Sequence, residues 1–337
     1  MLAQIARRLA TAVPTLIGVV IVTFLLTRVL PGDTAAYFAG PAATPEAIAQ
    51  VKAKLGLDRS LPQQFVGYVE GLALGDLGDS LSTGNSVLRD IKTRLPASAE
   101  LTLSGLILAI LIAVPLGILA AVRQGSWIDH ACRVLATAGV SLPVFFSGLL
   151  FVYVFYYRLG WAPAPLGRLD VFATAPDTVT GFYLIDSLIA GDFETFRAAF
   201  AQLVLPAVTL AFFALAPITR MTRASMLEVL ASDYVRTAWA SGLSPYTVVV
   251  TYAFRNAMLP VITTLGMVFS FLLGANVLVE KVFAWPGIGS FAVEALIASD
   301  YAPVQGFVLT MAIMYVALNL LIDVLYGVVD PRVRLEA

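Results

Sequence analysis

Long uncharged stretches alternate with charged segments along this chain. Six stretches of about 20 residues lie between charged residues: 9–27, 101–122, 134–157, 198–219, 256–279 and 301–322. A helix needs roughly 20 apolar residues to cross the hydrocarbon core of a bilayer, so each stretch predicts a transmembrane helix. The first has a longer apolar run than a cleaved signal peptide, which has a core of roughly 7–15 residues, so we expect it to be retained.

A seventh uncharged stretch, 237–254, is interrupted by Gly242 and Pro245. Because Gly and Pro favour turns, we place this stretch in a loop between the fourth and fifth spans. We expect a helix to run from the fourth span through Tyr234 and on to Ser241, a break at 242–245, and a second helical piece from Tyr246. The apolar residues of this loop are expected to face water and to form a docking surface for a soluble partner; they are Val235, Ala238, Trp239, Ala240 and Leu243.

The first loop, 31–99, is long and polar. Segments 45–55, 61–74 and 87–95 have the apolar spacing of short, half-buried helices, and Thr44 is a plausible N-cap for the first. We expect these helices to lie against the outer face of the membrane. Trp161 and Trp285 are expected to be aromatic anchors at the interface, where Tyr and Trp are enriched.

Basic residues concentrate in the short segments that would face inward if the N-terminus is inside. They include Arg7, Arg8, Arg123, Arg133, Arg220, Arg223, Arg236 and Arg255. Lys and Arg are enriched in short cytoplasmic loops. The distribution therefore predicts that both termini are cytoplasmic.

Composition supports a multi-pass membrane protein. Of the 337 residues, 59% are hydrophobic and 13% are charged, whereas soluble domains carry roughly a quarter charged residues. The mean hydropathy is +0.87. The net charge of −1 gives no basic field for binding nucleic acid.

Several kinds of chemistry are poorly supported by the residues present. The single Cys132 and the single His130 exclude an internal disulfide framework and a multi-histidine metal site, and we expect both to be structural. None of the four Lys residues follows a Gly, so a phosphate-binding loop of the G-x-x-x-x-G-K-[ST] type is absent. Among polar residues near the spans, we expect Asp323 to pair at the inner edge or at a subunit interface. Asn276 and Glu280 could line a path or be interfacial.

The loop between the fourth and fifth spans resembles the EAA loop of ABC-importer permeases, in its peptide-branch form. The matching residues are Arg236-Thr237-Ala238-Trp239-Ala240-Ser241-Gly242-Leu243 and then Arg255-Asn256-Ala257-Met258-Leu259-Pro260. Further motifs follow at similar spacing: Leu30–Asp33, Gly75–Gly78, Gly181–Asp186, Phe283–Gly289, Asp300–Gly306 and Leu325–Arg332. The chain departs from the pattern at Trp239 and Ser241, where basic residues are common, and Arg236-Thr237-Ala238 replaces the general Glu-Ala-Ala.

This resemblance covers nearly the whole chain. It places the sequence in the dipeptide, oligopeptide and nickel branch, most similar to the first permease subunit of bacterial dipeptide importers. It implies an all-α membrane protein with six transmembrane helices, the type I importer fold, both termini cytoplasmic, and a location in the bacterial inner membrane. The implied divisions are 1–30 for the N-terminal segment and first helix, 31–99 for a periplasmic segment, 100–330 for a five-helix core with the coupling loop at 220–259, and 331–337 for a cytoplasmic tail.

The resemblance also implies a set of partners. These are a second homologous permease, two cytoplasmic ATPases that bind ATP and Mg, an extracytoplasmic peptide-binding protein and the lipid bilayer. No cofactor is expected in this chain. ATPase coupling would involve Arg236, Thr237, Ala238, Trp239, Ala240, Ser241, Gly242, Leu243, Ser244 and Pro245, with Gly242 making the turn and Pro260 starting the fifth span.

The expected cargo is a dipeptide or a short oligopeptide. Nickel complexes, opines and glutathione stay open as alternatives. Because such cargo is polar, the path is expected to be a wet cavity between two permeases, touched by Ser141, Asn276 and Glu280. Two other hypotheses are an ion-coupled carrier or channel that works without ATPases, and an intramembrane enzyme, which the missing motifs disfavour.

Overall fold

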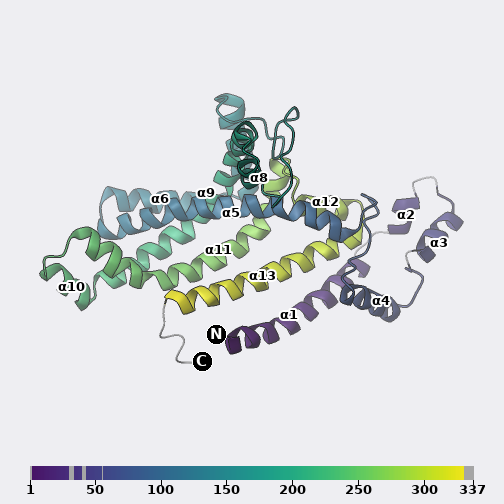
Figure 1. The fold of residues 1–337 in the computed structure, drawn as a ribbon, viewed down its shortest axis with the longest axis horizontal. Helices are drawn as coiled ribbons and strands as arrows, with labels where there is room; N and C mark the ends of the chain where they lie inside the picture. Colours follow the sequence, from purple (N-terminus) through teal and green to yellow (C-terminus); the bar gives the residue numbers. More distant parts are fainter. Residues whose placement is uncertain (1, 30–33, 40–42, 55, 330–337) are drawn as a thin grey trace.

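A computed structural model describes residues 2–29, 34–39, 43–54 and 56–329, and these ranges are helical apart from loops and one isolated bridge between Asp79 and Ser86 (Figure 1). The motif Leu30–Asp33 and the predicted tail 331–337 lie outside the described residues. The helices, with π-helical segments marked η, are α1 (Leu2–Val29), α2 (Thr34–Ala39), α3 (Pro45–Lys54), α4 (Leu61–Ala73), α5 (Val87–Val122), α6 (Trp127–Ser141), α7 (Val144–Phe151), η1 (Val152–Arg158), α8 (Tyr183–Ile189), α9 (Phe193–Leu230), α10 (Asp233–Ala240), η2 (Thr247–Phe254), α11 (Arg255–Val282), α12 (Ile288–Ile297) and α13 (Tyr301–Val329).

Within these ranges, five helices are long and apolar enough to cross a membrane. They are Ala10–Thr27 of α1, α5, α9, the continuous segment Thr247–Val282, and Tyr301–Val324 of α13. The predicted third span differs, because α6 and the α7–η1 segment meet at 103°. Leu142 is extended before Pro143, as expected of a residue that precedes proline. These two pieces together make the sixth candidate span.

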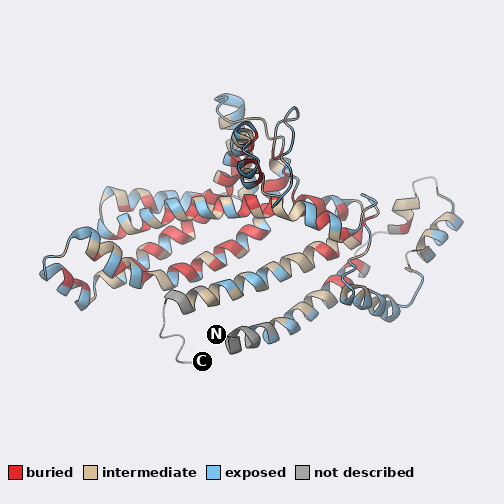
Figure 2. Cartoon of the chain, viewed as in Figure 1, coloured by how far each residue is buried: buried red, intermediate tan, exposed pale blue. Residues whose placement is uncertain are grey.

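The core lies between α5, α9 and α11, where buried residues concentrate (Figure 2). Small residues let α5 and α9 approach closely. A Cβ atom on Gly117 would stand 2.6 Å from the Cβ of Thr222, and one on Gly105 would stand 2.8 Å from the Cβ of Leu210. Small residues at helix contacts are typical of membrane proteins, in which close packing replaces the hydrophobic effect.

The segment 87–95 is helical as predicted and forms the start of α5. Two other predictions are wrong. The helix that continues the fourth span does not run unbroken to Ser241: it ends at Leu230, because Ser232 is extended. Pro260 lies inside α11 rather than at its start, since the helix already begins in the preceding π-helical segment.

The short helices of the first loop form as predicted. Thr44 Oγ1 accepts a hydrogen bond from the Ala47 amide at the start of α3. Helix α4 packs on α1, with the ring of Phe24 centred 5.2 Å from that of Phe65 and 5.9 Å from that of Tyr68. Helices α2–α4 lie at one end of the long axis of the molecule and α10 at the other (Figure 1).

Candidate coupling elbow and polar clamp

The predicted coupling residues form a compact bend, here called the elbow, at residues 231–246. Helix α10 starts after Ser232, and Asp233 in its first turn suits the positive end of the helix dipole. Its C-terminus closes with two backbone bonds: the Gly242 amide donates to Trp239 and the Leu243 amide to Ala238. This pair of bonds is the Schellman motif, which needs a left-handed residue. Gly242 supplies it with φ of 74°, which confirms the predicted turn.

The next helix starts at once with its own cap. The side-chain Oγ of Ser244 accepts from the Thr247 amide at 3.2 Å, and Pro245 occupies the first helical position, where a missing amide costs nothing. In the prediction of secondary structure, Ser244 and Pro245 belong to the break before the helix from Tyr246. Their spacing is in fact a helix start signal that could have been recognised.

One face of the elbow is buried against the ends of three long helices. Val235 and Ala238 pack with Ala121 of α5, Met226 of α9 and Ala257 of α11. Val235 is fully buried and Leu243 partly so. Helix α10 therefore packs on α9 and on η2, the segment that continues into α11, and shares one apolar cluster with the end of α5.

The opposite face of the elbow carries exposed aromatic residues. Trp239 is 45% exposed and Tyr246 is 74% exposed. The prediction that all five apolar residues of this loop face water is wrong for Val235 and Ala238, because the helical period places both in the apolar cluster with Met226. Leu243, which follows the turn at Gly242, is partly buried against the same cluster. The exposed set is Tyr234, Trp239, Ala240 and Tyr246.

An ion pair joins the start of α6 to the C-terminal part of α9. Arg223 holds Asp129 with two bonds, Nε to Oδ1 at 2.7 Å and Nη2 to Oδ2 at 2.8 Å. The Gly125 amide also donates to Asp129. Bidentate Arg–carboxylate pairs fix geometry as well as charge. This contact was not predicted, because residues 129 and 223 are far apart in sequence.

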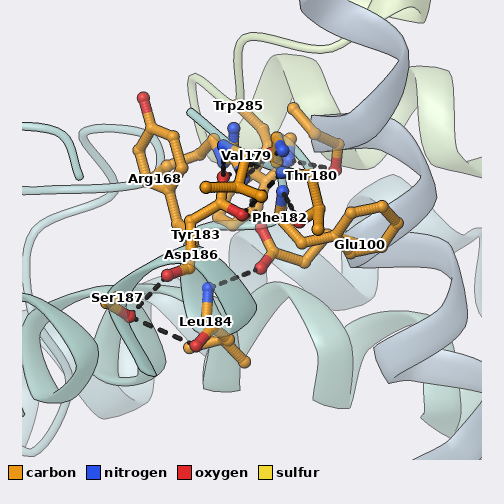
Figure 3. A network of polar contacts seen from close by, with 12 residues as sticks. Glu100, Arg168, Val179, Thr180, Phe182, Tyr183, Leu184, Asp186, Ser187 and Trp285 are labelled. Atoms are coloured by element: carbon orange, nitrogen blue, oxygen red, sulfur yellow. Dashed lines mark hydrogen bonds and ion pairs between the residues drawn. The ribbon is translucent and has the colours of Figure 1, made fainter. Parts of the chain in front are cut away.

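A second polar site, here called the clamp, lies in the N-terminal half of α5, away from the elbow. Arg168 Nη2 donates to Glu100 Oε2 at 2.6 Å and to the Gly181 carbonyl at 2.7 Å. The other carboxylate oxygen of Glu100 accepts from the Leu184 amide. The guanidinium also stacks on Tyr183, 3.4 Å from the ring centroid (Figure 3). Both charged side chains are buried, so the long loop 159–182 is fixed to α5 through this pair.

Glu280 forms the other half of the clamp. This fully buried carboxylate accepts from Ser98 Oγ, from Asn276 Nδ2 and from the Ser290 amide at the start of α12. Within the described ranges no Lys or Arg forms an ion pair with it; the neighbouring Lys281 pairs with Glu294. Neutral donors, including an amide at the N-terminus of α12, therefore satisfy the oxygens of this buried carboxyl group. A Cβ on Gly287 would stand 2.1 Å from Glu280 Oε1, so glycine is required there.

Trp285 completes the clamp. Its indole Nε1 donates to the Ala97 carbonyl at 2.8 Å, and the side chain is 1% exposed. The prediction that Trp285 is an interfacial anchor is therefore wrong, because its indole is enclosed between α5 and the turn before α12. Trp161 is 75% exposed, in keeping with an anchor.

Asp186 fixes the segment that enters α8. Its carboxylate accepts from the amides of Val179, Thr180 and Gly181 and from the Thr180 hydroxyl (Figure 3). Burial raises the pKa of Asp186, but the hydrogen bonds from Thr180 and the neighbouring amides outweigh it and hold the pKa below its usual range. The charged form is therefore the one that orders this segment.

The three predicted path residues are not brought together. Asn276 and Glu280 are hydrogen-bonded to each other inside the clamp. Ser141 is exposed at the end of α6 and donates only to Thr137 of its own helix. Their contact with cargo stays a prediction.

Comparisons with known proteins agree with this architecture. Residues 113–335 match the family described as binding-protein-dependent transport system inner membrane component, and residues 1–102 match its N-terminal membrane component family. The probable D,D-dipeptide transport system permease protein of Escherichia coli is 44% identical, over 94% of this chain and 93% of its own. The di/tripeptide transport system permease protein of Pseudomonas aeruginosa is 42% identical over 99% of both chains.

Among solved structures, the inward-facing methionine ABC transporter MetNI has a similar fold. Its matched chain superposes with a TM-score of 0.51 at 17% sequence identity, covering 70% of this chain and 93% of that one. At this identity the likeness concerns the fold alone. The overall fold of this chain is thus also found in a chain of that transporter.

Proposed function

Since the chain belongs to the family of binding-protein-dependent transport system inner membrane components, we propose that its cargo is a dipeptide or short peptide and that the elbow is its coupling element. The protein is a multi-pass permease component of an ABC importer in the inner membrane. Its relatives are named as permease proteins of dipeptide and di/tripeptide transport systems. At over 40% identity across the full length, the same cargo class is the simplest assignment for this chain.

The observation that carries the coupling role is the two-faced elbow. Its inner face packs in one apolar cluster with residues at the ends of α5, α9 and α11, while Trp239 and Tyr246 face outward. A partner that grips the outer aromatic residues would therefore move three spans at once, and rigid-body motion of this kind switches access in transporters. Aromatic residues are also frequent energetic centres of protein interfaces.

The partner set follows from this role. A second permease would supply the other half of the path, two ATPases would bind ATP and Mg and hold the two elbows, and an extracytoplasmic binding protein would deliver the peptide. This chain has no phosphate-binding loop in its sequence, so the energy would reach it through the elbow. We assign the elbow to the cytoplasmic side. Several arginines lie near it in the sequence, and Lys and Arg are enriched in short cytoplasmic loops.

The path itself would lie between the two permeases. Ser141 is exposed and remains our candidate for touching the cargo. Asn276 and Glu280 are enclosed by their own chain, so we expect them to shape the path by holding α11 and α12 in place.

The test is to strain the elbow without touching its surfaces. In the complete importer reconstituted in vesicles, we expect Gly242→Val to lower ATP-dependent dipeptide uptake about tenfold, because a side chain at a left-handed position costs about 1–2 kcal/mol. A Cβ at Gly242 meets no described atom within 4 Å, so within this chain the change acts through the backbone.

Two variants make the result specific. Gly242→Asn should keep most of the uptake, since Asn tolerates the left-handed conformation. Gly160→Val introduces the same kind of strain (φ 64°) in the loop beside the clamp, also in open space, and should leave the coupling of ATP hydrolysis to uptake intact. Unchanged uptake in Gly242→Val, or uptake without ATPases, would overturn the proposal.

A further inference from the structure

A seam between α1 and α13 contains two adjoining pockets that play no part in the elbow or the clamp. The two helices run side by side (Figure 1). One pocket of about 240 Å³ lies near Arg8 and a second of about 550 Å³ lies further along α1; Thr15 lines both. The seam therefore leads from one pocket into the other along a single helix.

The first pocket has a charged mouth. Arg8 Nη2 donates to Asp323 Oδ1 at 3.0 Å, and Arg8 Nε lies 2.8 Å from Asp323 Oδ2. The Arg8 side chain is 62% exposed, and a guanidinium has five N–H donors, so donors remain for another acceptor. Thr11 and Asn319 also line this pocket. A positive and a negative group thus stand next to each other at the surface.

The second pocket is an apolar trough. Its walls are mostly aliphatic and come from both helices and the end of α12: Val19, Val22, Leu26, Leu296, Val304 and Val308, with Gly18 near its entrance. Arg8 precedes the apolar span that begins at Ala10, so it stands at the level of lipid headgroups. From Arg8 to Gly18 the helix rises about 15 Å, which is half of a hydrocarbon core about 30 Å thick.

We propose that this seam binds one phospholipid with an ethanolamine headgroup. The phosphate accepts hydrogen bonds from the free donors of Arg8, the ammonium donates to Asp323, the ester region lies beside Thr11 and Thr15, and an acyl chain enters the trough at Gly18. The adjacent opposite charges match a zwitterion, because an anionic glycerol headgroup has no cation to offer Asp323. A choline headgroup has the charge but no N–H donor.

The experiment counts lipids retained by the importer complex, purified with its partners, after reconstitution in equal amounts of phosphatidylethanolamine, phosphatidylglycerol and phosphatidylcholine. Native mass spectrometry should show phosphatidylethanolamine enriched. We expect Arg8→Gln to lower its retention about tenfold, the usual scale for losing a charge-assisted hydrogen bond. Asp323→Asn should abolish the preference over the other two lipids.

A third variant tests the trough. A Cβ on Gly18 meets no atom of the described chain within 4 Å, so Gly18→Leu should fill the entrance without a clash and displace the lipid. Gly67→Leu in α4 also extends into open space, and Arg123→Gln removes another exposed arginine; both should leave retention unchanged. ATP hydrolysis reports that each complex is intact.

Three results would overturn this assignment. They are equal retention of the three lipids by the wild-type complex, unchanged retention in Gly18→Leu, and cross-links from a Gly18→Cys variant to another protein subunit. The last would mean that a polypeptide, not a lipid, covers the seam.

Discussion

The clamp, in the N-terminal half of α5, and the elbow, beside its C-terminal end, both hold α5 and α11, but by different means. In the clamp, two buried glutamates, one buried arginine and an indole tie α5 to the loop before α8 and to the start of α12. In the elbow, the ties to α5, α9 and α11 are contacts of Ala, Val and Met side chains. The surface charges of the elbow, such as the pair of Arg236 and Asp233, are almost fully exposed.

This difference bears on which end can move. Buried hydrogen bonds and ion pairs have narrow geometry, and breaking one leaves a costly unpaired group. Apolar contacts between small side chains lack that directionality, so one packed helix can slide over another in a shear motion. The clamp is therefore suited to be the fixed end of the helices, and the elbow to be the end at which a partner acts.

The largest effect should come from unpairing the clamp. We expect Arg168→Met to cost about 3–5 kcal/mol of unfolding free energy, because it leaves the Glu100 carboxylate buried without its cation. Chemical denaturation of the purified protein in detergent measures this value. The double variant Glu100→Gln, Arg168→Met should recover at least half of the loss, since no unpaired charge remains.

A matched control lies nearby. Lys281 and Glu294 form an ion pair at 2.6 Å, but it is partly exposed, and pairs of this kind contribute about 1 kcal/mol or less. Lys281→Met should therefore have a small effect. If it destabilised the protein as much as Arg168→Met, the burial of the clamp would not explain its strength.

Helix positions were more predictable from the sequence than the contacts between helices. Stretches without charge located the spans, and Gly242 with Pro245 located the turn of the elbow, because these signals are local. The third span bends at Pro143, and stretches without charge do not show where a span bends. Pro143 itself was the local signal for this bend, because it favours an extended residue before it. The Arg168–Glu100 pair and the burial of Trp285 were not predictable from spacing, since each joins segments 68 or more residues apart. The orientation of Val235 and Ala238 likewise depended on where α9 ended.

The next effect separates folding from docking at the elbow. Trp239→Ala should change the unfolding free energy by less than about 0.5 kcal/mol, as for exposed positions in general. If Trp239 is a hot-spot residue of the interface, the substitution should lower the binding free energy of the ATPases by about 2 kcal/mol. Co-purification and titration of the ATPases onto the reconstituted permease measure this affinity. Trp127, which is 79% exposed at the start of α6, provides the control, and an equal loss in Trp127→Ala would argue against a specific site.

The smallest effect concerns the pH dependence of the loop beside the clamp. The hydrogen bonds from Thr180 and neighbouring amides hold the pKa of Asp186 below its usual range. Asp186 therefore stabilises the fold fully at pH values above the ordinary Asp pKa of about 3.9. That stabilisation is lost as the pH falls through the lowered pKa of the folded state.

Asp186→Asn keeps one acceptor, so its cost at neutral pH should be about 1 kcal/mol. The difference in melting temperature between wild type and Asp186→Asn should shrink as the pH is lowered from about 6 to about 2.5. A difference that stayed constant over this range would mean that the charge of Asp186 does not order residues 179–181.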